Sequence, residues 1–84
     1  MWLLSYDVSA DGRRAKVAAR LERRGFRILY SSFVISGGRR EAEAAYNEAQ
    51  GIAADTDRLL LLRTCERCEL TRIGAAPEAG GASW

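Results

Sequence analysis

The residue of this sequence best placed to do chemistry is Asp7, at the end of an apolar run that begins at Trp2. Aspartate is disfavoured inside strands, so a carboxylate at the end of a buried strand has a chemical role or a local structural one. As a functional residue, Asp7 would hold a divalent metal ion or polarise water beside a phosphate. One carboxylate is too little for the octahedral oxygen shell of Mg²⁺, so such a site needs a second copy of the chain. The structural alternative is a turn carboxylate that accepts from the backbone of residues 9–12.

A stripe of cations follows Asp7 on the next predicted helix. Residues three and four apart share one helix face, and cations recur at this spacing as far as residue 27. Guanidinium groups pair bidentately with phosphate, and the N–H groups at a helix start favour the same ligand. The stripe therefore predicts contact with a nucleic-acid backbone, without base-specific readout; the alternative is a solvated helix face. The candidate contacts are Arg13, Arg14, Lys16, Arg20, Arg23 and Arg27.

A Cys-x-x-Cys pair, Cys65 and Cys68, is half of a structural zinc site, and the chain has no His and no further Cys. We therefore interpret the pair as residues of a tight turn or as a reversible disulfide. The absence of His also excludes a Ser-His triad for Ser31 and Ser32. The sequence contains neither a P-loop nor a Gly-x-Gly-x-x-Gly motif.

Strands and helices must position these residues. The hydrophobic periodicity predicts strands over residues 2–7, 26–35, 58–64 and 70–73, and helices over 12–24 and 39–50. Gly25 is expected to end the first helix. The inward stripe of the first helix is Val17, Ala18 and Leu21. The stripe of the second helix is mostly small and would let it lie close to a sheet: Ala42, Ala45, Tyr46 and Ala49, extending toward Ile52.

These elements predict a ferredoxin-like α+β domain of βαββαβ type, an antiparallel sheet with both helices on one face. The other sheet face has no predicted cover. The run of four leucines after Arg58 nevertheless indicates strand residues buried on both faces. We therefore expect a homodimer that packs sheet against sheet.

Length and composition describe a small ordinary domain. The 84 residues are 48% hydrophobic and 29% charged, and the core of so short a chain is marginal. Lys and Arg exceed Asp and Glu by nine to three in residues 1–40 and fall below them by four to eight in residues 41–84, so one basic and one acidic face are expected. We expect a domain over residues 1–74, a flexible tail over 75–84, and, without a signal peptide or membrane span, a cytoplasmic protein.

Several short motifs taken together resemble the small CRISPR-associated Cas-two (Cas2) family, over about residues 2–74. In the first half they are Tyr6-Asp7-Val8-Ser9, Asp11, Arg13-Arg14, Val17, Leu21, Gly25-Phe26-Arg27 and Tyr30-Ser31-Ser32-Phe33. In the second half they are the leucine strand ending in Thr64-Cys65-Glu66-Arg67-Cys68, and Thr71-Arg72-Ile73-Gly74. The family often has Gln where Leu29 stands and an acidic residue where Val34 stands.

The resemblance implies a ferredoxin-like homodimer that takes part in CRISPR spacer acquisition. There it would bind double-stranded DNA and bridge subunits of the Cas-one (Cas1) integrase. It also implies, for some members, a metal-dependent endonuclease with Asp7 as catalytic residue and as ligand of Mg²⁺ or Mn²⁺ at the dimer interface. Tyr6, Ser31 and Phe33 would support that site, with Arg13, Arg14 and Arg27 around it. A toxin family of metal-dependent endoribonucleases with a related fold, acting on RNA phosphodiesters, is the alternative.

Overall fold

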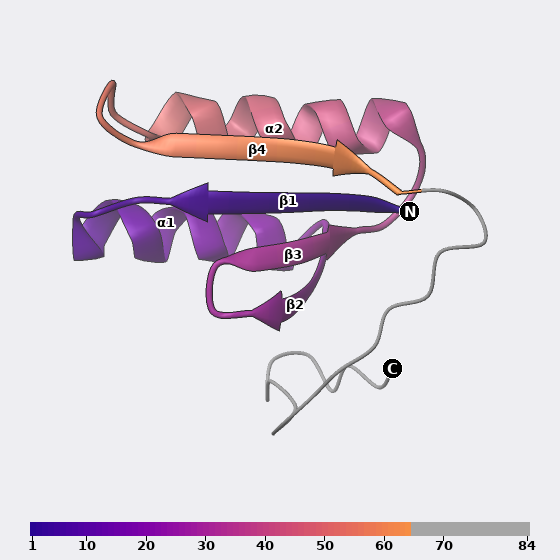
Figure 1. Cartoon of the computed structure of the whole chain (residues 1–84), viewed down its shortest axis with the longest axis horizontal. Coiled ribbons are helices and arrows are strands. Elements are labelled where there is room, and N and C mark those ends of the chain that lie inside the picture. Colours follow the sequence, from indigo (N-terminus) through magenta and orange to yellow (C-terminus); the bar gives the residue numbers. More distant parts are fainter. Residues whose placement is uncertain (65–84) are drawn as a thin grey trace.

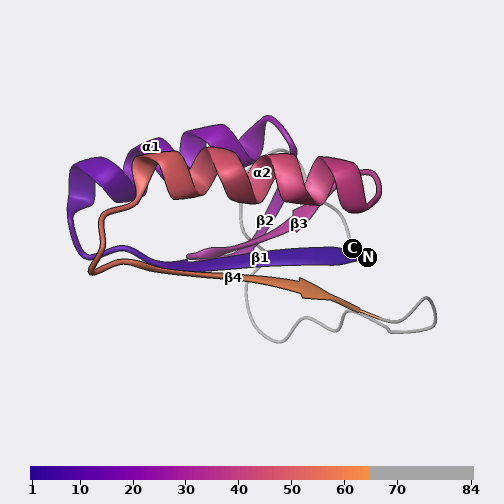
Figure 2. The same ribbon diagram turned by 90° about the horizontal axis from the view of Figure 1, so that it is seen from above.

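The chain folds into a four-stranded antiparallel sheet with two helices on one face (Figure 1). The computed structural model describes residues 1–64. Its elements are β1 (Trp2–Asp7), α1 (Asp11–Glu22), β2 (Gly25–Leu29), β3 (Ser32–Ile35), α2 (Arg39–Ile52) and β4 (Arg58–Arg63). The strand order is β2-β3-β1-β4, and Figure 2 shows α1 and α2 side by side in one layer above the sheet. This arrangement confirms the predicted ferredoxin-like α+β fold.

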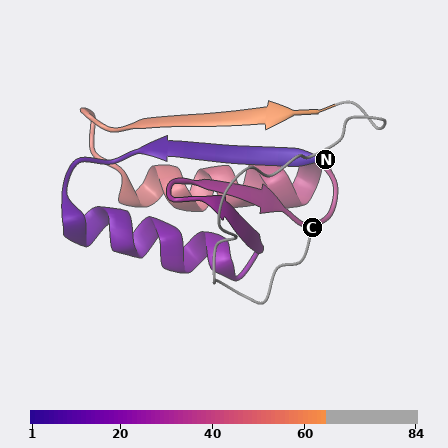
Figure 3. The same ribbon diagram turned by 60° about the horizontal axis from the view of Figure 1, so that its bottom comes forward.

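The prediction of one strand over residues 26–35 was wrong, because this segment is a hairpin (Figure 3). β2 and β3 pair antiparallel around a turn at Tyr30 and Ser31, with an irregular register between Arg27 and Leu29. The turn contains no Gly, Pro, Asn or Asp, which are the residues that usually mark one. The hairpin supplies the second and third strands of the βαββαβ order. The predicted strand at 70–73, the Cys-x-x-Cys pair and the tail at 75–84 lie outside the described residues.

The core lies between the sheet and the helix layer. Leu4 and Phe33 are fully buried from the sheet side, and Val17 and Leu21 from α1. Three alanines of α2 are also fully buried: Ala42, Ala45 and Ala49. Small side chains let α2 approach the sheet closely, as its sequence predicted. Neither helix of residues 1–64 is long and apolar enough to cross a membrane.

Gly25 was expected to end the first helix, but α1 ends at Glu22 and Gly25 is the first residue of β2. A β-carbon built at Gly25 would lie 1.8 Å from the carbonyl oxygen of Val34 on the neighbouring strand. The glycine is therefore required by the close approach of two backbones at the end of the β2–β3 ladder. The only residue with a left-handed backbone among those described is Gly37, with φ of 95°, in the loop before α2.

The second sheet face, called here the open face, carries no helix in the described part of the chain (Figure 2). The register joins Val34, Leu3 and Leu62 across three strands on this face, and Ser32, Ser5 and Leu60 in the next row. Leu60 is 60% exposed and Leu62 is 50% exposed. Residues 1–64 therefore cover the leucine strand on one face only, and they leave an apolar surface that a partner could bury.

Candidate functional site

Asp7 is the last residue of β1 and lies exposed on the open face. Strand side chains alternate between faces, so Asp7 points away from the core that buries Tyr6. It stands opposite Arg58, the first residue of β4. Within residues 1–64 its carboxylate makes no hydrogen bond or ion pair, which removes the capping role as its explanation.

A depression of about 330 Å³ surrounds Asp7 at this end of the sheet. Ser5, Asp7, Arg58 and Leu60 contribute to its lining. The Ser5 hydroxyl lies 2.7 Å from that of Ser32. No group of three or more acidic, His or Cys side chains able to hold a metal ion occurs in the described residues. Residues 1–64 therefore offer a single carboxylate in this depression, and Mg²⁺ would need ligands from elsewhere.

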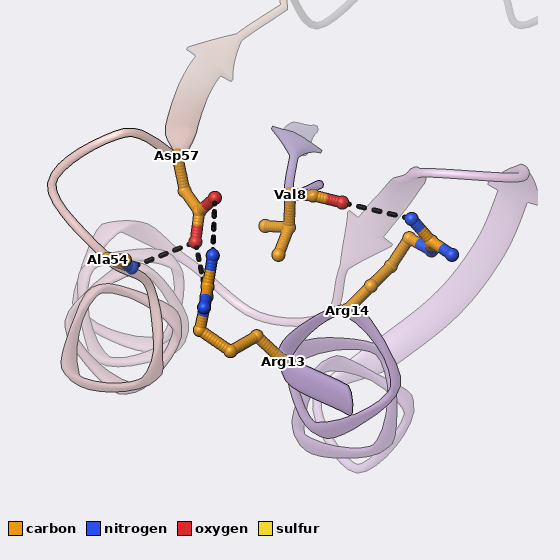
Figure 4. Close-up of polar contacts among 5 residues, drawn as sticks. All are labelled: Val8, Arg13, Arg14, Ala54 and Asp57. Atoms are coloured by element: carbon orange, nitrogen blue, oxygen red, sulfur yellow. Dashed lines mark hydrogen bonds and ion pairs between the residues drawn. The ribbon is translucent and has the colours of Figure 1, made fainter. Parts of the chain in front are cut away.

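Arg13, predicted to bind nucleic acid, is half-buried and forms an ion pair within the chain (Figure 4). Its Nε donates to Asp57 Oδ2 at 2.9 Å and its Nη2 to Oδ1 at 3.3 Å. The Asp57 side chain is fully buried and also accepts from the backbone N–H of Ala54. The hydrogen bond from Arg13 lowers the pKa of the Asp57 carboxyl below its ordinary value, and the hydrogen bond from the Ala54 N–H makes a smaller contribution in the same direction. This ion pair ties the start of α1 to the loop that leads into β4, so it fixes the end of the sheet where Asp7 lies.

Replacing Asp57 by Asn should destabilise the protein in a pH-dependent way. A carboxyl whose pKa is lower in the folded state stabilises that state above its unfolded pKa of about 4, and this contribution is lost as the pH falls through the folded pKa. The urea midpoint of Asp57→Asn should therefore lie below that of the wild type at pH 7, and the gap should narrow by pH 3. Asp55→Asn, at an exposed carboxylate nearby, is the control. A gap of equal size at both pH values would contradict this role.

Arg14 turns to the other side of α1 (Figure 4). Its Nη1 donates to the carbonyl of Val8 at 3.0 Å, and its Nη2 pairs with Asp11. The guanidinium carbon lies 5.7 Å from the centre of the Tyr30 ring. Arg14 therefore links α1 to the end of β1 and to the β2–β3 turn.

The middle of the cationic stripe is the part that faces solvent. Lys16 and Arg20 are exposed on α1, and Arg23 is exposed at its C-cap. Arg20 reaches Glu48 of α2 only at 3.8 Å, while Lys16 and Arg23 have no ion pair within residues 1–64. Arg24, outside the predicted set, holds Glu48 at 2.6 Å and lowers the pKa of that carboxyl. The cations of α1 thus divide into those that join elements and three that remain available to a ligand.

The side chains expected around Asp7 lie on two different faces. Tyr6 and Phe33 belong to the core between sheet and helices, with ring centres 6.2 Å apart, and Arg27 lies over the Phe33 ring at 5.3 Å. Ser31, in the hairpin turn, accepts from the backbone N–H of Tyr6 through its carbonyl. Within one chain the sheet therefore separates Tyr6, Arg27 and Phe33 from Asp7.

Sequence reasoning missed Arg58 and Asp57. Both sit at the start of a strand whose pairing with β1 is not visible from local pattern. An antiparallel β1–β4 pair places the end of one strand beside the start of the other, and this topology brings Arg58 to Asp7. The charged residues between Asp55 and Arg58 could have indicated a site. Their partners, Arg13 for Asp57 and Asp7 for Arg58, are about 50 positions away in the chain, so the local sequence does not reveal them.

Comparisons with known proteins agree on one family. The family model described as CRISPR associated protein Cas2 matches residues 1–72. The chain is 36% identical over 62 residues to a protein of Aeropyrum pernix named CRISPR-associated endoribonuclease Cas2, covering 71% of this chain and 67% of that one. A protein of Archaeoglobus fulgidus, named CRISPR-associated endoribonuclease Cas2 1, is 34% identical over 73 residues, covering 84% and 78%. The solved structure of a hypothetical protein, TT1823 of Thermus thermophilus, superposes with a TM-score of 0.73 at 28% identity, covering 92% and 95%.

Proposed function

The chain belongs to the family of CRISPR associated protein Cas2, and from this membership we propose that it acts in CRISPR adaptation. In this role it forms a homodimer that binds double-stranded DNA and bridges subunits of the Cas1 integrase. The protein is a partner of the integrase and holds the incoming DNA in place.

The observation that supports this proposal is that exposed leucines lie on one face of the sheet and exposed cations of the α1 region lie on the other side. The open face carries exposed Leu60 and Leu62, and the helices lie on the opposite side of the sheet (Figure 2). Two copies that pack through their open faces keep both α1 helices on the outside. Lys16, Arg20 and Arg23 of each copy then face solvent, where they can meet the phosphates of a duplex.

Alanine at all three of these cations should weaken duplex binding and reduce its salt dependence. The logarithm of the binding constant falls with that of salt concentration with a slope of about −0.9 per phosphate contact. Removing six cations per dimer should therefore flatten the slope by up to about 5 and lower affinity at least about tenfold at moderate salt. Fluorescence anisotropy with a labelled duplex over a range of salt concentrations measures both quantities.

The control for the triple variant is Asn47→Ala combined with Gln50→Ala, at exposed neutral positions of α2. This control removes polar side chains from the same helix layer without changing charge. Its affinity and salt slope should match those of the wild type. A triple variant that is folded and binds with the wild-type slope would refute the assignment of these cations.

A second function, cleavage of phosphodiester bonds, is favoured by the position of Asp7. Its carboxylate is exposed and without a partner in the described residues, and it lies on the face that the proposed dimer would bring together. Both curated relatives carry the name endoribonuclease. Residues 1–64 of one chain do not provide a complete Mg²⁺ or Mn²⁺ site, so no catalytic step through a metal is derived for them. A pair of Asp7 side chains across the dimer is the arrangement that such cleavage would require.

A further inference from the structure

A small pocket on the helix side of the sheet collects functional groups that neither proposed activity uses. Its lining comes mainly from α1 and the β2–β3 hairpin, and its volume is about 150 Å³. Tyr6, Arg14, Arg27 and Tyr30 line it, with Asp11 and two alanines of α1. The sheet separates this helix-side pocket from Asp7, so the two sites are distinct within a chain.

Arg27 has an unmet hydrogen-bonding group here. Its Nε is buried and donates to no acceptor in the described residues. The guanidinium is held over the Phe33 ring, and its Nη2 lies 3.5 Å from a carboxylate oxygen of Glu22. A buried N–H without an acceptor is unfavourable. The Arg27 side chain lines the pocket, so a small anion bound there would supply an acceptor to its guanidinium.

Two further donors reach the same space. The Tyr6 hydroxyl points to the carbonyl of Tyr30 at 3.4 Å, too long for a strong hydrogen bond. Burial raises the pKa of this hydroxyl although Arg27 and Arg14 act to lower it, so it stays protonated and can donate. Arg14 contributes a second guanidinium, which is positioned by the Val8 carbonyl.

The acidic residues beside the pocket do not block an anion. The Asp11 side chain is 90% exposed and that of Glu22 is 50% exposed. Ion pairs at such exposed positions contribute little free energy, so both carboxylates can turn to water. A phosphate group in their place would accept from Arg27 and Arg14 in charge-assisted hydrogen bonds, which are stronger.

We propose that the helix-side pocket binds a single phosphate group, using Arg27, Arg14 and the Tyr6 hydroxyl as donors. The phosphate belongs to a nucleic-acid backbone or is free in solution, since the two share the chemistry that the pocket recognises. Binding of a backbone phosphate rests on the proposed function, whereas binding of free phosphate does not.

Titration with inorganic phosphate, followed by the NMR signal of the Arg27 Nε–H, tests the pocket. The signal should shift and saturate, and chloride at matched ionic strength should not reproduce the shift. Phosphate binding, followed by amide signals of Ala15 and Ala18, should weaken about tenfold in Arg27→Lys, which keeps the charge but loses the Nε donor. It should also weaken in Tyr6→Phe, which removes only the hydroxyl. Arg40→Lys, at an exposed arginine of α2 outside the pocket, should bind as the wild type does.

A shift that does not saturate, or that chloride reproduces, would overturn the proposal. The proposal would also be overturned if the Arg27→Lys and Tyr6→Phe variants were both folded and bound phosphate as the wild type does. A duplex that displaces inorganic phosphate from Arg27 supports the pocket with a backbone phosphate as ligand. A saturable phosphate shift that persists beside bound duplex, or in a protein that does not bind duplex, supports it with free phosphate as ligand.

Discussion

Leu60→Asp should convert the proposed dimer to a monomer at micromolar concentrations. Leu60 is 60% exposed on the open face, where it stands on the edge strand β4 at the end of the row formed with Ser32 and Ser5. Burying a leucine side chain contributes about 1.5–3 kcal/mol. A two-fold interface contains each residue twice, so loss of both side chains costs about 3 kcal/mol or more. A buried carboxylate adds a desolvation penalty.

The expected rise in the dimer dissociation constant is therefore at least about 100-fold. Sedimentation equilibrium over a range of protein concentrations measures it. Asn47→Asp, which adds the same charge at an exposed position of α2, should leave the dimer intact. Far-ultraviolet circular dichroism shows whether Leu60→Asp remains folded, as expected for a side chain outside the core. A wild type that is monomeric, or a folded Leu60→Asp that dimerises normally, would refute the open face as the dimer interface.

Most of the fold could be predicted because its signals are local. The inward faces of both helices follow from spacing alone, and Val17, Leu21 and Ala45 are buried as expected. The turn at Tyr30 and Ser31 was missed because it carries no turn residue. Gly25 was predicted to end a helix. The structure requires glycine there because its backbone packs closely against Val34 of the neighbouring strand, and such a contact between strands is not visible in the local sequence.

The candidate site was harder to predict because it depends on long-range pairing. Side chains alternate along β1, so Asp7 and Tyr6 lie on opposite faces of the sheet. Residues that are adjacent in the sequence therefore do not share one site. Helical spacing grouped cations as far as Arg27, which lies on β2, and it could not show which of them have internal partners. Arg13 is paired with Asp57, 44 positions away, and no property of the helix itself reveals that partner.

Asp7→Asn should separate the two proposed functions. The substitution keeps the size of the side chain and removes its charge at an exposed position without partners in residues 1–64. The dimer, the affinity for duplex and spacer acquisition beside Cas1 should therefore be unchanged, within about twofold. The rate of any cleavage that depends on Mg²⁺ or Mn²⁺ should fall at least about 100-fold, because the substitution removes the metal ligand itself. Loss of a group that only supports a metal ligand already lowers activity by about 10–100-fold.

The control is Asp55→Asn, the same chemical change at an exposed carboxylate outside the open face. Cleavage by this variant should equal that of the wild type. Cleavage that survives in purified Asp7→Asn would exclude Asp7 as the metal ligand and indicate a contaminating nuclease. A folded, dimeric Asp7→Asn that no longer supports acquisition would instead show that the carboxylate itself is needed. The architectural proposal would then fail, because it requires the open face for pairing and the cations of α1 for DNA, but not the charge of Asp7.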